Sequence, residues 1–198
     1  MNLARQVIAF AANIDGEYVT IGGGEPTLHP NFWEILGLCL GNFENVWMAT
    51  NGTQTGIAVS LANMAKKGVL GVALSLDRYH DSDMVDPRVH RAFGSTEVRS
   101  LCGANQNSND LREIRTVPAS RLIKAGRCTW GIDECCCDDL IIMPDGRIKM
   151  CGCDHAHTVG RLPAGFFSDD FMQWYQENER PCSKRVTRLS DGSFESKD

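Results

Sequence analysis

The sequence lacks any hydrophobic run long enough to cross a membrane, and it has no excess of basic residues. A membrane span needs about 18 consecutive apolar residues, and every apolar stretch here is interrupted before that length. There are 20 Lys and Arg against 25 Asp and Glu, so the formal net charge is -5. The basic residues form no stripe along the chain. We therefore expect neither a membrane protein nor one whose main partner is nucleic acid.

We expect no export signal, and this bears on the nine cysteines. The amino-terminal run carries one arginine, but Asn13 and Asp15 interrupt its apolar part and no small-residue cleavage site follows. We interpret it as a helix and expect a cytoplasmic protein. In the reducing cytosol, closely spaced cysteines are more often metal ligands than disulfide partners. The cysteines therefore indicate a metal-binding unit.

The sequence is rich in alternating strand and helix patterns. An amphipathic helix pattern over residues 3–13 precedes an apolar strand, and helices and strands then alternate. The helix pattern over residues 55–68 is expected to end at Gly68. The expected strands lie within residues 18–21, 45–53, 69–77 and 113–117. Apolar strands separated by helices are typical of a parallel sheet buried on both faces. We expect an α/β fold whose parallel strands form an open sheet or part of a barrel.

Three glycines follow the first of these strands, in the stretch YVTIGGGEPTLHP. Glycines at the carboxyl end of a strand permit positive φ angles and leave main-chain groups open to a ligand. That end of a parallel sheet is where ligands bind. The phosphate motif G-x-x-x-x-G-K is absent, and Thr27 interrupts G-x-G-x-x-G. Glu25 would repel a phosphate, so the turn suits an ammonium group.

The segment GGGEPTLHP resembles the Gly-Gly-Glu-Pro segment of radical S-adenosylmethionine enzymes. The stretches ATNGT and SLDRYH resemble the following strand ends of that family, and the resemblance spans roughly residues 4–162. It implies a partial (β/α) barrel and S-adenosylmethionine as a cofactor. It also implies a set of cofactor-binding residues: Gly22, Gly23, Gly24, Glu25, Pro26, Asn51, Ser75 and Asp77. Taken singly, each motif is also an ordinary turn.

The chain departs from the family at its three-cysteine motif, C-x-x-x-C-x-x-C, which does not occur in the 198 residues. In the family, these thiolates hold a [4Fe-4S] cluster whose open iron chelates the cofactor and delivers the electron that yields a 5'-deoxyadenosyl radical. We therefore expect either an amino-terminally truncated enzyme or a remnant that has lost the chemistry, and in both cases no radical activity of this chain. Loss of the family's first strand would leave a sheet edge unpaired and favour self-association.

Six of the nine cysteines fall within residues 128–153, around a Pro-Asp-Gly turn. The turn suits a type I geometry with Gly146 as the bulge residue. Met143 then pairs with Arg147, and the same register pairs Ile141 with Lys149. The sequence thus predicts a β-hairpin.

Continuing this register separates thiols from aliphatic side chains. Asp139 would face Cys151, and Cys137 would face Cys153. Because side chains alternate across a sheet, one face is expected to carry Cys135, Cys137, Cys151 and Cys153. The other face is expected to carry Leu140, Ile142, Ile148 and Met150. Four thiolates on one face could hold an iron-sulfur cluster or tetrahedral zinc, and Cys128 is a further candidate ligand.

The spacing of this hairpin resembles the SPASM and twitch auxiliary-cluster modules that follow some radical S-adenosylmethionine enzymes. The resemblance implies an auxiliary [4Fe-4S] cluster and, by analogy, a peptide or protein substrate. We expect a partial barrel over 1–127, the cysteine-rich hairpin over 128–167, and a final helix with a polar tail over 168–198. Ser168 is expected to be the N-cap of that helix. The rival interpretation is a non-catalytic thiolate module for zinc or iron on a remnant α/β scaffold. Whether the chain is an enzyme stays open.

Overall fold

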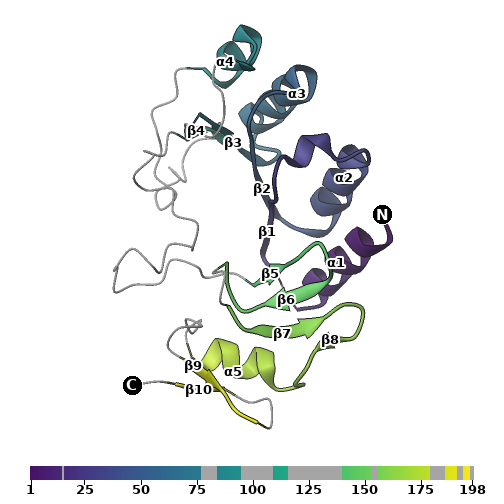
Figure 1. Cartoon of the computed structure of the whole chain (residues 1–198). Helices are drawn as coiled ribbons and strands as arrows, with labels where there is room; N and C mark the ends of the chain where they lie inside the picture. The colour runs from purple at the N-terminus through teal and green to yellow at the C-terminus, as the bar shows by residue number, and fades with distance from the viewer. Residues whose placement is uncertain are drawn as a thin grey trace. The chain divides into compact units, whose positions relative to one another are not determined.

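A computed structural model describes residues 1–14, 16–76, 84–94, 109–115, 140–152, 156–178, 186–190 and 194–196. The chain divides into two compact units (Figure 1). One consists of Asp15–Leu122, and the other combines Met1–Ile14 with Ile123–Asp198. Among the described helices, none is both long and apolar enough to span a membrane.

The Asp15–Leu122 unit is built on a parallel four-stranded sheet in the order β1-β2-β3-β4. Its strands are β1 (Tyr18–Ile21), β2 (Asn45–Thr50), β3 (Gly71–Ser75) and β4 (Arg112–Arg115). Its helices are the 3-10 turn η1 (Pro26–Leu28), α2 (Phe32–Asn42), α3 (Thr55–Lys66) and α4 (Pro87–Phe93). This confirms the expected α/β fold with parallel strands. Closure toward a barrel stays a prediction.

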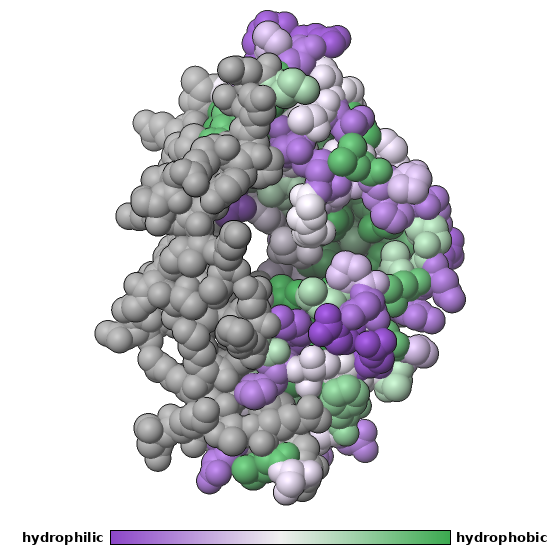
Figure 2. Space-filling view, in the orientation of Figure 1, coloured by the Kyte–Doolittle hydropathy of each residue, from purple (hydrophilic) through white to green (hydrophobic). Residues whose placement is uncertain are grey.

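Alternating burial along β2 shows which side of the sheet the helices cover. Val46, Met48 and Thr50 are buried, whereas the residues between them are only half-buried. In Figure 1, α2 and α3 lie along one side of the strands. On α3 the buried residues are Ala58, Leu61, Ala62 and Ala65, a small-residue face that lets the helix pack closely. The exposed side of α4, at the top of Figure 2, is hydrophilic.

Two glycines of this unit have clear structural roles, one at a helix end and one beside an indole ring. Gly68 follows α3 with a φ of +73°, and its N-H bonds the carbonyl of Ala65, so it ends the helix as the sequence predicts. At Gly71 a Cβ would lie 2.5 Å from Cδ1 of Trp47. Glycine therefore lets the indole of Trp47 lie against β3. The guanidinium of Arg115 is 5.2 Å from the centroid of that ring.

The other unit contains an antiparallel sheet in the order β5-β6-β7-β8, together with a separate β9-β10 pair. The elements are α1 (Asn2–Asn13), β5 (Ile141–Ile142), β6 (Arg147–Lys149), β7 (Thr158–Arg161), β8 (Gly165–Phe166), α5 (Phe171–Glu177), β9 (Val186–Arg188) and β10 (Phe194–Ser196). The final helix begins later than the pattern predicts, because Asp170 rather than Ser168 occupies its N-cap. The expected polar tail includes the antiparallel β9-β10 pair.

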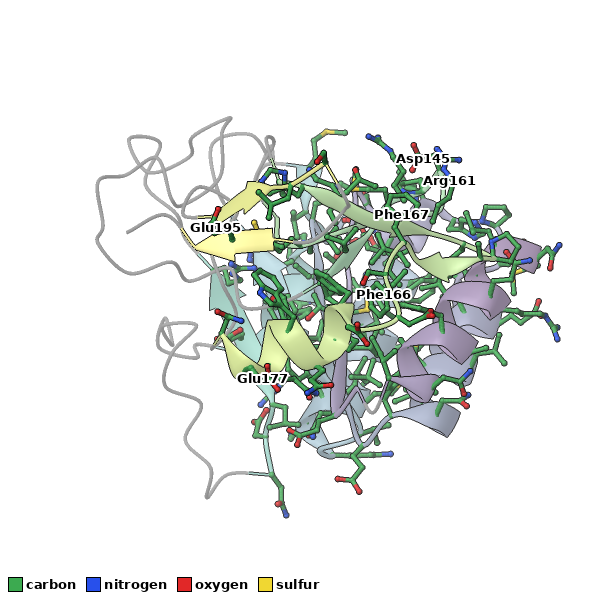
Figure 3. The ribbon with its side chains drawn as sticks, turned by 90° about the horizontal axis from the view of Figure 1, so that it is seen from below. Asp145, Arg161, Phe166, Phe167, Glu177 and Glu195 are labelled. Atoms are coloured by element: carbon green, nitrogen blue, oxygen red, sulfur yellow. The ribbon has the colours of Figure 1, made fainter. Side chains whose placement is uncertain are left out.

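The α1 helix joins the core of this second unit. Leu3, Val7 and Phe10 recur at helical spacing and pack against the buried cluster of the sheet and α5. That cluster consists of Ile148, Met150, Val159, Leu162, Phe171 and Tyr175. Phe166 lies between α5 and α1 in Figure 3, with its ring centroid 5.1 Å from that of Phe10. The three sequence ranges 1–127, 128–167 and 168–198 stay a prediction.

The β5-β6 hairpin forms in the predicted register over its described residues. Ile141 pairs with Lys149, the N-H of Met143 bonds the carbonyl of Arg147 at 2.8 Å, and Gly146 has a φ of +83°. The aliphatic face is also confirmed, because Leu140, Ile142, Ile148 and Met150 all belong to the apolar core. The predicted pairings of Asp139 and Cys137 involve residues outside the described ranges.

Candidate functional site

The glycine turn after β1 has more glycine than its own conformation requires. Gly23 has a φ of +125°, which favours glycine. Gly22 and Gly24 have no positive φ, and a Cβ added at either would meet no heavy atom within 4 Å. All three residues are exposed. Neither packing nor backbone strain accounts for glycine at positions 22 and 24, so the space beside the turn can admit a ligand.

At two other positions, Gly52 and Gly160, the fold itself explains why the residue is glycine. At Gly52 the φ is +75° and a Cβ would lie 2.7 Å from Leu74 Cδ1. At Gly160 a Cβ would collide with the main-chain carbonyl of Gly165. Those glycines are explained by the fold itself. Gly22 and Gly24 have open space where a side chain would be, as do the helical glycines Gly37, Gly41 and Gly56, but Gly22 and Gly24 lie at the carboxyl end of a parallel strand.

Glu25 follows the glycines and joins the ends of two neighbouring strands. Its Oε1 accepts hydrogen bonds from Thr27 N at 3.1 Å, from Thr27 Oγ1 at 2.6 Å and from Thr50 Oγ1 at 3.0 Å. Its Oε2 accepts from Asn51 N at 2.6 Å. The carboxylate is half-buried and caps the start of η1. It thus lies at the carboxyl ends of β1 and β2, on the edge of the sheet where ligands bind in parallel α/β folds.

Two residues of this site, Thr27 and Thr50, were not singled out from the sequence. They are the buried polar side chains among the described residues, at 4% and 1% exposure. Both hydroxyls bond Glu25. A signal for Thr50 was present, since it continues the inward-facing series of Val46 and Met48. A polar residue in such a position needs a partner.

The other predicted cofactor residues lie at neighbouring strand ends. Asn51 directly follows β2, and Ser75 ends β3; the pairing of Thr50 with Leu74 places the two at the same level of the sheet. The side-chain Oδ1 of Asn51 accepts from Thr53 N at 3.0 Å and from Thr53 Oγ1 at 2.8 Å. Pro26 begins η1 beside Glu25. Asp77 lies outside the described residues.

Of the five predicted thiol ligands, the described ranges contain Cys151. It is buried, at 1% exposure. That it shares a face with the other thiols stays a prediction. The other four, Cys128, Cys135, Cys137 and Cys153, fall outside the described residues. Within those ranges, no group of three or more His, Cys, Asp or Glu side chains is arranged to hold a metal ion.

Cys39 is buried on α2 at 3% exposure. Burial raises the pKa of this thiol to about 11, because the apolar surroundings disfavour the thiolate. The side chain therefore behaves as a small hydrophobic group of the core. It also provides a buried cysteine with which Cys151 can be compared.

Comparison with known proteins gives one partial likeness. A stretch of 60 residues is 40% identical to mycofactocin maturase MftC of Mycobacterium ulcerans, and 38% identical to the proteins of that name from Mycobacterium tuberculosis and Mycolicibacterium smegmatis. The match covers 30% of this chain but 15% to 16% of each relative, so the chain accounts for about a sixth of their length. No family model matches the chain, and no solved structure does. The partial homology supports the radical S-adenosylmethionine family that the glycine turn resembles.

Proposed function

We propose that this chain carries the S-adenosylmethionine-binding strand ends of a radical S-adenosylmethionine protein. The observation that carries the proposal is the pair Gly22 and Gly24, which have open space in place of side chains and lie next to a carboxylate held at the carboxyl edge of a parallel sheet. The methionine part of this cofactor bears a positively charged ammonium group beside a sulfonium. Bare main chain and one negative charge suit both.

Each predicted residue has a role in this proposal. Main-chain groups of Gly22, Gly23 and Gly24, together with Glu25, receive the ammonium group, and Pro26 directs the chain into η1. Asn51, Ser75 and Asp77 meet the carboxylate or the ribose. When bound to a reduced [4Fe-4S] cluster, S-adenosylmethionine supplies a 5'-deoxyadenosyl radical. The residues of this chain bind and orient the cofactor. They do not hold that cluster, because the given sequence contains no C-x-x-x-C-x-x-C.

The proposal includes the cysteine hairpin as an auxiliary metal centre. Cys135, Cys137, Cys151 and Cys153, with Cys128 as a further ligand, would hold a [4Fe-4S] cluster. The pairing of Ile141 with Lys149 favours this role, because Cys151 follows Lys149 by two residues in the predicted register. A peptide or protein substrate fits the name maturase carried by the similar proteins. The second candidate function is a non-catalytic zinc or iron module that uses the same thiols.

Cofactor binding can be tested at Gly24. We expect Gly24→Val to weaken binding of S-adenosylmethionine at least about tenfold, because the side chain would fill the open space, with little change in melting temperature. Isothermal titration calorimetry measures the affinity. The control is Gly37→Val on α2, where a Cβ also meets nothing within 4 Å. Equal affinity of Gly24→Val and the unaltered chain would contradict the proposal.

The metal centre can be tested with two buried cysteines. After anaerobic reconstitution with iron and sulfide, we expect broad visible absorption that Cys151→Ala strongly reduces and Cys39→Ala leaves intact. Both thiols are at most 3% exposed, so loss of packing is similar in the two variants. If the unaltered chain shows no such absorption after reconstitution but binds zinc stoichiometrically, that result would favour the second candidate function.

A further inference from the structure

The Glu25 carboxylate already accepts several hydrogen bonds from the protein itself, more than a carboxylate that only bound a ligand would need. A carboxylate oxygen offers about two lone-pair positions. Oε1 already accepts three hydrogen bonds, all from Thr27 and Thr50. Oε2 accepts one, from the main chain of Asn51. Among the described residues, Oε2 is therefore the oxygen with capacity for a further donor.

The Thr50 hydroxyl has a defined direction in this arrangement. Its oxygen accepts from Gly52 N at 3.1 Å, so its own proton is free to point at Glu25. At 1% exposure it has no access to water as an alternative partner. Hydrogen bonds to a charged acceptor are stronger than those between neutral groups. The contact joins residues 25 positions apart, so it ties the glycine turn to the end of β2.

We propose that Glu25, Thr27 and Thr50 form a latch that sets the shape of the Gly22–Gly24 main chain, with Thr27 and Thr50 as positioning residues. Through this latch the turn presents its main chain and the Oε2 oxygen to the ammonium group of the ligand. The inference rests on the proposed function for the identity of that ligand. The latch itself rests on the hydrogen bonds around Glu25.

The test compares three variants of the full chain. Thr50→Val removes the hydroxyl at nearly constant volume, and Thr50→Ser keeps it. Thr20→Val makes the same change on β1, where the side chain is exposed. The ligands are S-adenosylmethionine and 5'-methylthioadenosine, which lacks the ammonium and carboxylate groups. Calorimetry below the melting temperature gives affinities, and hydrogen exchange reports on the Asn51 amide that bonds Glu25.

We expect Thr50→Val to weaken binding of S-adenosylmethionine about tenfold, because one hydrogen bond to a charged group is lost. Affinity for 5'-methylthioadenosine should stay within about twofold, since it does not use the latch. Exchange at the Asn51 amide should accelerate in Thr50→Val and return toward normal in Thr50→Ser. Thr20→Val should change none of these quantities. A residue that only stabilised the fold would lower the melting temperature without this selective loss.

Two outcomes separate this inference from the proposed function. If the unaltered chain binds S-adenosylmethionine and Thr50→Val binds it equally well, the positioning role is overturned and the proposed function stands. If the unaltered chain binds no S-adenosylmethionine, the proposed function fails, and unchanged Asn51 exchange in Thr50→Val then overturns the latch as well. Should Thr50→Val not fold, Thr27→Val carries the same comparison, because its hydroxyl donates to the same oxygen.

Discussion

At the scale of single residues, the surroundings of a side chain decide its chemistry more than its type does. Cys39 is buried on α2, and its apolar surroundings raise the pKa of its thiol to about 11. Likewise, Thr27 and Thr50 are small polar residues that would be unremarkable on a surface. Their burial against Glu25 makes them part of the candidate site.

The raised pKa of Cys39 leads to a prediction at this scale. Iodoacetamide at pH 8 should leave Cys39 unlabelled in the native chain and label it in urea, because the thiolate is the reactive form. Peptide mass spectrometry measures the labelling. A pKa of about 11 in the folded chain lies above the usual 9.0, so the unfolded chain loses this proton first as the pH rises.

The same pKa predicts how stability depends on pH. The contribution of Cys39 should be constant below about pH 9 and should decline between about pH 9 and pH 11. Relative to Cys39→Ala, the decline should reach about 2 kcal/mol. Urea unfolding across this range provides the comparison. Rapid labelling of the native thiol, or parallel pH profiles for the two proteins, would contradict the burial argument.

At the scale of elements, one arginine connects a strand end to a helix end. Arg112 Nη1 donates to the carbonyl of Ala92 at 2.6 Å, and its other nitrogens bond Asp110 at 2.8 and 2.6 Å. The guanidinium of Arg112 keeps the pKa of the Asp110 carboxyl below its usual value. With the side chain of Arg112 only 14% exposed, β4 is held to the end of α4 by a largely desolvated contact.

A prediction at this scale compares two arginines. Arg112→Met should destabilise the unit by about 2 kcal/mol, because it removes the donor to the Ala92 carbonyl and the hydrogen bonds that Arg112 gives to Asp110. Arg88→Met provides the matched control, since Arg88 also pairs with an aspartate two positions earlier but is 66% exposed. An exposed ion pair contributes little. Chemical denaturation measures both variants, and similar losses in the two would show that desolvation is unimportant here.

At the scale of the whole molecule, both ends of the chain contribute to one compact unit. The first 14 residues share a unit with residues 123–198, while the parallel sheet forms from the segment between. The apolar face of α1 is completed by residues more than 130 positions away, such as Ile148 and Phe166. The hairpin unit therefore requires α1 in order to bury its core.

This organisation predicts a selective effect of Phe10→Ala. It should destabilise the unit containing the β5-β6-β7-β8 sheet by about 2 kcal/mol, since Phe10 is partly buried against Phe166. Exchange rates of amides in β1 to β4 should stay unchanged. Phe167→Ala is the control, because its side chain is 56% exposed. Hydrogen exchange measured by mass spectrometry resolves the two units, and equal acceleration in both would contradict separate cores.

Most helices and strands could be predicted from the sequence, because the patterns that indicate them are local. Strand alternation, the Gly68 helix end and the Pro-Asp-Gly hairpin each depend on a few neighbouring residues, and the pairing of Ile141 with Lys149 follows from the turn alone. The helix start at Ser168 was wrong by two residues, because several acidic and polar residues there can each occupy the cap. The β9-β10 pair was missed, since its strands are short and polar.

By itself, the sequence determined the parallel α/β alternation, the open glycine turn and the hairpin register, because periodicity and turn chemistry act over a few residues. Tertiary structure alone decided that Thr27 and Thr50 bond Glu25 and that α1 completes the core of the hairpin unit. The physical reason is that a local pattern can show that a residue such as Thr50 faces inward, but not which side chain it meets there. Its partner Glu25 lies 25 positions away, and the contact of Thr27 with Glu25 depends on the fold of the η1 turn.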